Sequence, residues 1–182
     1  MFIFGIILLV VIIYFAGTYN RLITLTSRAK EAWADIDVQL KRRYDLIPNI
    51  VSTVKGYATH EREAFENVTK ARALAMGAKS VGEHAQAENQ LSGALKSLFA
   101  ISEAYPDLKA NDNFLRLAEE LADTENKIQA ARRFYNTNVR DLIVAIESFP
   151  SNLTAKLFGF KSLSYFELAG DSKERENPKV SF

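Results

Sequence analysis

The 182-residue sequence contains no cysteine and only two histidines, His60 and His84. The lack of cysteine excludes disulfides, a lipid-modified cysteine and a thiol nucleophile. A di-iron helical bundle needs two Glu-x-x-His pairs, and a zinc-protease helix needs a second histidine after His60-Glu61, so neither motif is present. The eight glycines form no phosphate-binding loop and no G-x-S-x-G motif. We therefore expect no enzyme activity, no catalytic residue, no metal and no cofactor.

Charged side chains are absent from Met1 to Tyr19, and Arg21 is the first to appear. As a helix, this segment would be about 28 Å long, close to the roughly 30 Å hydrocarbon core of a bilayer. It lacks the basic start and the small-residue cleavage site of a secretory signal peptide. We therefore predict an uncleaved transmembrane anchor over residues 1–20, with the lipid bilayer as a partner. The alternative is the buried core helix of a soluble domain.

Basic residues flank this predicted anchor on one side only, at Arg21, Arg28 and Lys30. Because Lys and Arg resist translocation, the pattern favours an N-terminus outside the cell and a cytoplasmic soluble domain. A periplasmic domain is the alternative, and the lack of cysteine is compatible with both compartments.

Apolar residues recur at steps of three and four through the remaining chain, as in amphipathic helices. The sequence therefore predicts an all-α protein in which the transmembrane helix continues into an up-and-down antiparallel bundle over residues 21–149. Four long helices are expected, the first of which ends near residues 41–44. The last repeats apolar residues about every 3.5 positions, the spacing of a coiled coil.

Capping and helix-breaking residues divide this predicted bundle. Asp45 is suited to cap the second helix, whose first turn would contain Pro48. A turn around Ser80 would precede the third helix, Pro106 would end it, and Asn111 or Asp112 would cap the fourth.

Residues 150–168 are apolar and aromatic with interspersed lysines. In an alternating bundle the fourth helix returns to the membrane, so this segment would lie at the bilayer surface. The alternative is that it covers one end of the bundle. The side chains expected nearest the membrane are Phe149, Leu157, Phe158, Phe160 and Phe166. The charged segment 169–182 is expected to be a disordered tail.

Several polar residues lie on or beside the apolar stripes, where an unpaired charge is costly to bury. We expect them to pair between helices, with Arg132 or Arg72 bound to Glu125 or Glu61. Such a network would fix helix register or, alternatively, form a binding or proton-handling site. Its predicted members are Asp37, Arg43, Asn49, Glu61, Arg72, Glu103, Glu125, Arg132 and Asn136.

Charge is balanced overall but uneven along the chain. The chain has 23 Lys and Arg residues against 22 Asp and Glu residues, yet residues 21–80 carry a net charge of +4 and residues 83–125 carry −6. Such asymmetry allows copies of one molecule to attract each other as a homo-oligomer. The alternative is that these are solvated faces with an accidental bias. The overall balance argues against nucleic-acid binding, and the basic run 41–43 more often ends a helix than contacts phosphates.

Several motifs together resemble the LemA family of bacterial membrane-anchored proteins. They are Tyr19-Asn20, the run from Ala32 to Val51, Val54-Lys55-Gly56-Tyr57 with His60-Glu61, Ala71-Arg72, the run from Glu103 to Lys109, Glu125-Asn126-Lys127-Ile128, the run from Ala131 to Asn136, and Phe149-Pro150. The resemblance covers residues 1 to about 168, with the tail after Leu168 outside it. It implies an N-terminal membrane helix followed by a long antiparallel helical bundle. It supplies no reaction, and one branch of the family is associated with biogenesis of a bacterial organelle membrane.

These observations lead to three hypotheses of function. The first is a non-enzymatic, single-pass scaffold that self-assembles on the bacterial inner membrane and organises or shapes it. The second is an adaptor that presents its helical bundle to a membrane protease or a signalling protein. The third is an enzyme that uses internal Glu and Arg residues, which would require a deep pocket lined by Glu61, Arg72 and Glu125.

Overall fold

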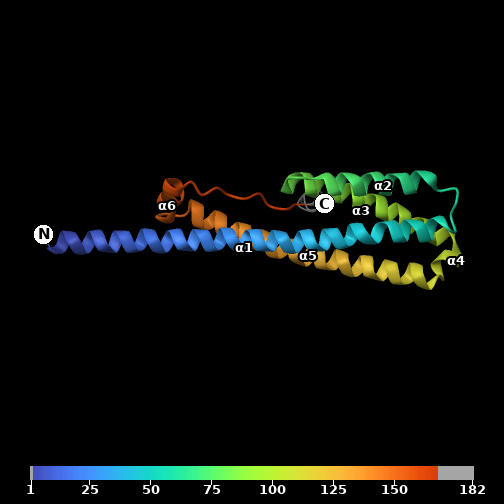
Figure 1. The fold of residues 1–182 in the computed structure, drawn as a ribbon, viewed down its shortest axis with the longest axis horizontal. Coiled ribbons are helices and arrows are strands. Elements are labelled where there is room, and N and C mark those ends of the chain that lie inside the picture. The colour runs from blue at the N-terminus through green and yellow to red at the C-terminus, as the bar shows by residue number, and fades with distance from the viewer. Residues whose placement is uncertain (1, 168–182) are drawn as a thin grey trace, which may run out of the picture. The chain divides into compact units, whose positions relative to one another are not determined.

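The computed structural model describes residues 2–167, and the regular structure among them is entirely helical (Figure 1). The helices are α1 (Phe2–Lys55), α2 (Arg62–Gly77), α3 (Val81–Ala104), α4 (Pro106–Lys109), α5 (Asp112–Glu147) and α6 (Ser151–Phe158). The predicted all-α helical bundle is confirmed for the described part of the chain. The tail predicted over residues 169–182 lies outside the described residues.

The chain divides into two compact units. Residues 2–36 and 130–165 form the unit that we call the anchor unit, whereas residues 37–129 with 166 and 167 form the hairpin unit. Helices α1 and α5 each contribute to both units without a break in their hydrogen-bonded helix.

Helix α1 continues to Lys55, so the end predicted near residues 41–44 was wrong. The apolar stripe explains the continuation, because Tyr44, Ile47 and Ile50 stay buried in phase with Leu40. Asp45 therefore lies exposed inside α1 and does not cap a second helix. Pro48 also lies inside α1, at an exposed position.

The turn between α1 and α2 begins at Gly56, whose N–H donates to the carbonyl oxygens of Ser52 and Thr53. The second helix therefore starts at Arg62, after this turn, rather than at residue 45.

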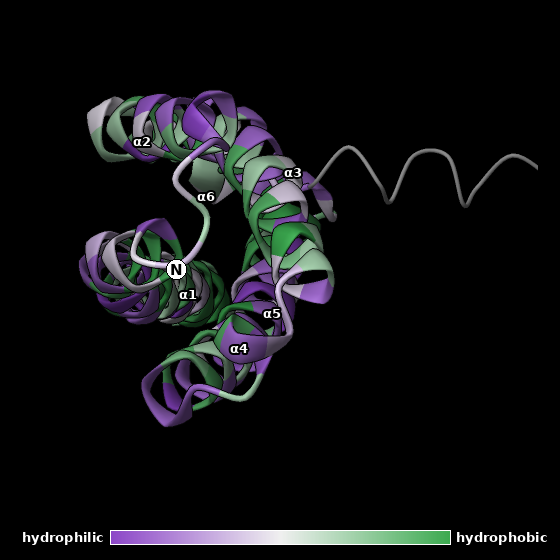
Figure 2. Ribbon diagram, turned by 90° about the vertical axis from the view of Figure 1, so that its right-hand side faces the viewer, coloured by the Kyte–Doolittle hydropathy of each residue, from purple (hydrophilic) through white to green (hydrophobic). Residues whose placement is uncertain are grey.

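Helices α2 and α3 form an antiparallel hairpin within the hairpin unit (Figure 1). The predicted turn lies before α3, and Ser80 also caps this helix: its hydroxyl accepts the N–H of Glu83 at 3.2 Å, and the Glu83 carboxylate accepts the N–H of Ser80 at 3.2 Å. This reciprocal pair satisfies two N–H groups that a helix start leaves unbonded. Figure 2 shows hydrophobic and hydrophilic residues interspersed along α2 and α3, as expected for amphipathic helices.

Pro106 and Asn111 separate α3, α4 and α5. Helix α3 ends at Ala104, and Pro106 occupies the first turn of the short α4, where its missing N–H costs nothing. The Asn111 side-chain oxygen then accepts the N–H of Phe114 at 3.0 Å. This bond confirms the predicted cap at the start of α5.

The anchor unit has its own apolar core of Leu22, Leu142, Ala145 and Ala155. These residues join α1, α5 and α6, and the hydroxyl of Tyr135 adds a hydrogen bond to the Ser164 carbonyl oxygen at 2.9 Å. The segment after α5 is thereby held against α1 and α5 within this unit.

Candidate functional site

The N-terminal part of α1 carries an apolar stretch that is long and apolar enough to cross a membrane. No residue of its 18-residue window is buried within the described protein. A core helix of a soluble domain would be mostly buried, so the alternative of a buried core helix does not fit this stretch.

Helix α6 and the turn before it carry further exposed apolar side chains in the anchor unit. Phe149, Leu157 and Phe158 are 81%, 70% and 53% exposed. The ring of Phe158 lies 4.8 Å from that of Tyr19, and the ring of Phe160 lies 5.7 Å from it. Four of the five residues that we expected near the membrane therefore gather in the anchor unit.

Phe166, the fifth of these residues, is 1% exposed and belongs to the hairpin unit. Its side chain is used in packing and is not available to a surface.

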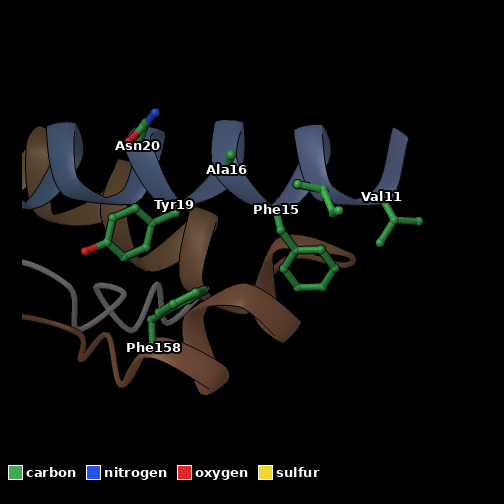
Figure 3. Close-up of a pocket in the computed structure, with 7 residues that line it drawn as sticks. Val11, Phe15, Ala16, Tyr19, Asn20 and Phe158 are labelled. Carbon is green, nitrogen blue, oxygen red and sulfur yellow. The ribbon is translucent and has the colours of Figure 1, made fainter. Parts of the chain in front are cut away.

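A shallow groove of about 420 Å³ lies between α1 and α6 in the anchor unit (Figure 3). Phe15 and Tyr19 of α1 point towards α6, and Phe158 of α6 lies beneath Tyr19. Asn20 lies at the same end of the groove as Tyr19, so this end is polar and the remainder is apolar. The full lining is Val11, Ile12, Phe15, Ala16, Tyr19, Asn20 and Phe158.

A buried ion cluster lies in the hairpin unit and is centred on Arg43. One terminal nitrogen of Arg43 donates to Glu88 at 2.9 Å and lies 3.0 Å from a carboxylate oxygen of Glu125. The other donates to the hydroxyl of Ser92 at 2.8 Å. The cluster therefore ties α1 to α3 and α5 through a guanidinium that is almost fully buried.

Tyr44 extends this cluster on α1. Its hydroxyl donates to the second carboxylate oxygen of Glu88 at 2.5 Å, and its backbone carbonyl accepts a bond from Arg72 of α2 at 2.8 Å. Both oxygens of Glu88 therefore face donors from α1. This closed arrangement is suited to fixing helix register.

Burial is the main cause of the pKa shifts of Glu88 and Tyr44 in this cluster. Desolvation raises the pKa of the Glu88 carboxyl above its ordinary value, although Arg43 and the Tyr44 hydroxyl oppose the rise. Desolvation, the hydrogen bond to Glu88 and the charge of Glu88 together raise the pKa of the Tyr44 phenol. Tyr44 therefore remains a hydrogen-bond donor throughout the physiological range.

The other polar residues expected in the network vary in exposure. Asp37, Asn49 and Glu103 are exposed, whereas Glu61, Arg72, Glu125, Arg132 and Asn136 are half-buried. The structure unites Arg43 with Glu125 and brings Arg72 to the backbone of Tyr44. The sequence pattern had suggested neither of these pairings.

Glu88 is the central residue that sequence reasoning missed, although it is only 2% exposed. A signal for it exists, because Glu88, Leu91, Leu95 and Leu98 follow one another at steps of three, four and three. This spacing places Glu88 on the buried face of α3.

Part of the charge asymmetry is neutralised inside the hairpin unit. Arg43 pairs with Glu88 and Glu125, and Arg42 lies 3.8 Å from Asp123. The basic run of α1 thus meets the acidic residues of α3 and α5 within one molecule. Attraction between copies consequently needs support from another feature of the surface.

The sequence was compared with protein families and with individual known proteins. A model of the LemA family matches residues 32–182. The match includes the tail after Leu168, which we had placed outside the resemblance, and it leaves out residues 1–31, which we had placed inside it.

Three individual relatives are each about one quarter identical to this chain in sequence. The chain is 26% identical over 182 residues to the magnetosome protein MamQ of Magnetospirillum gryphiswaldense, a match that covers 85% of this chain and 67% of that protein. Magnetosome protein MamQ 2 of Paramagnetospirillum magneticum is 24% identical, with the same coverage. Protein LemA of Metamycoplasma hominis is 27% identical over 172 residues, which cover 91% of this chain and 77% of that protein.

Proposed function

Since this chain belongs to the LemA family, we propose that it is a non-enzymatic, single-pass scaffold that assembles with copies of itself on the bacterial inner membrane and organises or shapes it. The observation that carries the proposal is the fully unburied apolar stretch of α1 beside the exposed apolar side chains of α6. Two of the relatives named above are magnetosome proteins. Those names agree with the family branch connected with a bacterial organelle membrane.

The free energy of membrane insertion supports the anchoring role. Eleven large apolar side chains between Phe2 and Ile13 are exposed. Full burial of such a side chain contributes about 1.5–3 kcal/mol, and because these side chains are only partly exposed, together they contribute about 10–20 kcal/mol. Helix α6 adds Leu153, Leu157 and Phe158 with Lys156 at its edge, the composition of an interfacial helix.

The proposed topology follows from the charges next to the anchor. Arg21, Arg28 and Lys30 lie directly after the apolar stretch. They favour an N-terminus outside the cell and a cytoplasmic bundle.

Self-assembly is supported by an exposed stripe on α5 in the anchor unit. Phe134, Thr137, Asp141 and Val144 are all exposed and follow one another at steps of three, four and three. This is the spacing of a coiled-coil seam, and Phe134 and Val144 are each 56% exposed. A second copy of α5 would cover both apolar side chains. Single exposed apolar residues are common on monomers, so the position of Phe134 and Val144 on one face of α5 carries this argument.

Cross-linking in membranes, together with the mass of the solubilised particle, tests the proposal. The wild-type chain should give oligomers in both measurements. Combined Phe134→Ser and Val144→Ser substitutions should weaken them, whereas Leu115→Ser, at an exposed site on the same helix, should not. A wild-type protein that is monomeric in both measurements would contradict self-assembly.

The adaptor remains a second candidate because of one feature of the hairpin unit. Leu74 and Met76 of α2 are exposed, and Leu74 lines a groove of about 250 Å³ between α2 and α3. An adaptor should co-purify with a stoichiometric membrane protease or signalling protein and should lose it on Leu74→Ser substitution. A scaffold should give neither result.

A further inference from the structure

The groove between α1 and α6 has the length and polarity of one bilayer leaflet. Its lining runs along α1 from Val11 to Asn20. Val11 and Tyr19 are eight residues apart, or about 12 Å along the helix axis. The hydrocarbon region of one leaflet is about 15 Å deep, half of the roughly 30 Å core. The apolar part of the groove therefore spans most of a leaflet.

The polar end of the groove lies where a lipid has its ester and headgroup. Tyr19 and Asn20 are the last uncharged residues before Arg21. Tyrosine prefers the membrane–water boundary, where its ring stays in apolar surroundings and its hydroxyl meets water. A molecule that fills this groove must accordingly be apolar over most of its length and polar at one end.

Phe158 makes this site different from the remaining lipid-facing surface of α1. Its ring packs against Tyr19 at 4.8 Å and is the part of the groove lining that comes from α6 (Figure 3). A chain in the groove would contact protein on two sides, whereas a lipid elsewhere on α1 would contact one. The groove volume of about 420 Å³ lies within the range of small-molecule sites.

We propose that the groove between α1 and α6 binds the acyl chain of one phospholipid from the leaflet nearest the bundle, with its ester region at Tyr19 and Asn20. This inference rests on the proposed membrane anchoring and adds a specific ligand to it. An acyl chain that follows α1 from Val11 to Tyr19 would contact Phe15 of α1 and Phe158 of α6.

Photolabelling of the full-length protein tests the proposal. The protein is reconstituted in phosphatidylethanolamine and phosphatidylglycerol vesicles that contain a trace of phospholipid with a diazirine in its acyl chain. Flotation on a density gradient first measures membrane association. After illumination, mass spectrometry maps the lipid adducts along α1 and α6.

Phe158→Ser is the informative variant, and Leu157→Ser is its matched control. Leu157 is 70% exposed on the same helix and does not line the groove, whereas Phe158 does. We expect wild-type adducts concentrated on the groove residues, a reduction of about tenfold in Phe158→Ser, and little change in Leu157→Ser. Circular dichroism of both variants checks that helix content is retained.

The outcomes separate this inference from the proposed function. The protein could float while its lipid adducts are spread evenly around α1 or are reduced equally in both variants. Either result would overturn the lipid site and leave the anchor intact. If the protein floats but the groove residues are unlabelled and the opposite face of α1 is labelled, a second copy occupies the groove. This result would also overturn the lipid site. A protein that does not float would contradict both the anchor and the lipid site.

Discussion

Removal of the Glu88 carboxylate should strongly destabilise the hairpin unit. In Glu88→Ala, the buried guanidinium of Arg43 loses its bond at 2.9 Å and the hydroxyl of Tyr44 loses its acceptor. Truncating one partner of a buried ion pair typically costs about 3–5 kcal/mol. Because Arg43 keeps Glu125 at 3.0 Å and Ser92 at 2.8 Å, we expect the lower end, about 3 kcal/mol.

Thermal unfolding of the full-length protein in detergent micelles measures this loss. For a chain of this size, about 1 kcal/mol corresponds to 2–4 °C, so Tm should fall by about 6–12 °C. Glu88→Gln keeps one acceptor oxygen but removes the charge, so its Tm should fall by less. Circular dichroism at 222 nm reports the transition through the loss of helix.

Glu103→Ala is the matched control for this prediction. Glu103 lies on the same helix as Glu88 but is exposed, so its replacement should shift Tm very little. Equal shifts in Glu88→Ala and Glu103→Ala would refute the assignment of Glu88 as the centre of the buried cluster.

Three further predictions concern the cap, the anchor-unit core and pH. Ser80→Ala removes the side-chain acceptor of Glu83 and should cost about 1 kcal/mol in unfolding free energy; an unchanged Tm would argue against the capping box. Leu22→Ala should lower the free energy of unfolding by about 2–5 kcal/mol because Leu22 is fully buried, whereas Ile23→Ala, at an exposed site, should lower it little. Similar decreases of Tm in both variants would count against the observed core. The pKa of the Glu88 carboxyl is higher in the folded state than its unfolded value near 4.5, so the folded state favours the protonated carboxyl. The stabilisation of the fold by this protonation is fully present below pH 4.5 and is lost as pH rises through the folded pKa. Tm of the wild type relative to Glu88→Gln should therefore decline with rising pH, and a constant difference from pH 4 to 8 would contradict the raised pKa.

Local sequence signals predicted the turn at Ser80 and the cap at Asn111, whereas the start of the second helix was misplaced. Ser80 with Glu83 and Asn111 with Phe114 are caps formed by residues three positions apart, so the sequence holds both partners of each bond. The amphipathic repeat likewise predicted an all-α bundle, because helix periodicity is a property of one segment.

The end of α1 was mispredicted because it depends on tertiary contacts. The run Lys41-Arg42-Arg43 has the composition of a helix C-terminus. In the structure, Arg43 instead lies inside α1 and is paired with Glu88, which is 45 residues away in sequence. The partner of a buried charge is not encoded nearby, so no local pattern could distinguish a helix end from an ion-pair site.

Charge along the sequence was also an incomplete guide to association. The excess of basic residues over 21–80 and of acidic residues over 83–125 suggested attraction between copies. Folding brings Arg42 to Asp123 and Arg43 to Glu88 and Glu125 within one chain. The exposed stripe on α5 became apparent only when the exposure of Phe134 and Val144 was known.

The position of α6 relative to the bilayer tests the central claim most directly. Because the chain has no cysteine, Leu157→Cys creates a single site for a nitroxide label on the full-length protein in vesicles. Electron paramagnetic resonance then compares collisions of the label with oxygen, which concentrates in lipid, and with a water-soluble nickel complex. We predict a label that oxygen reaches readily and nickel does not. A label at residue 157 that nickel reaches as freely as a nitroxide in water would contradict the account.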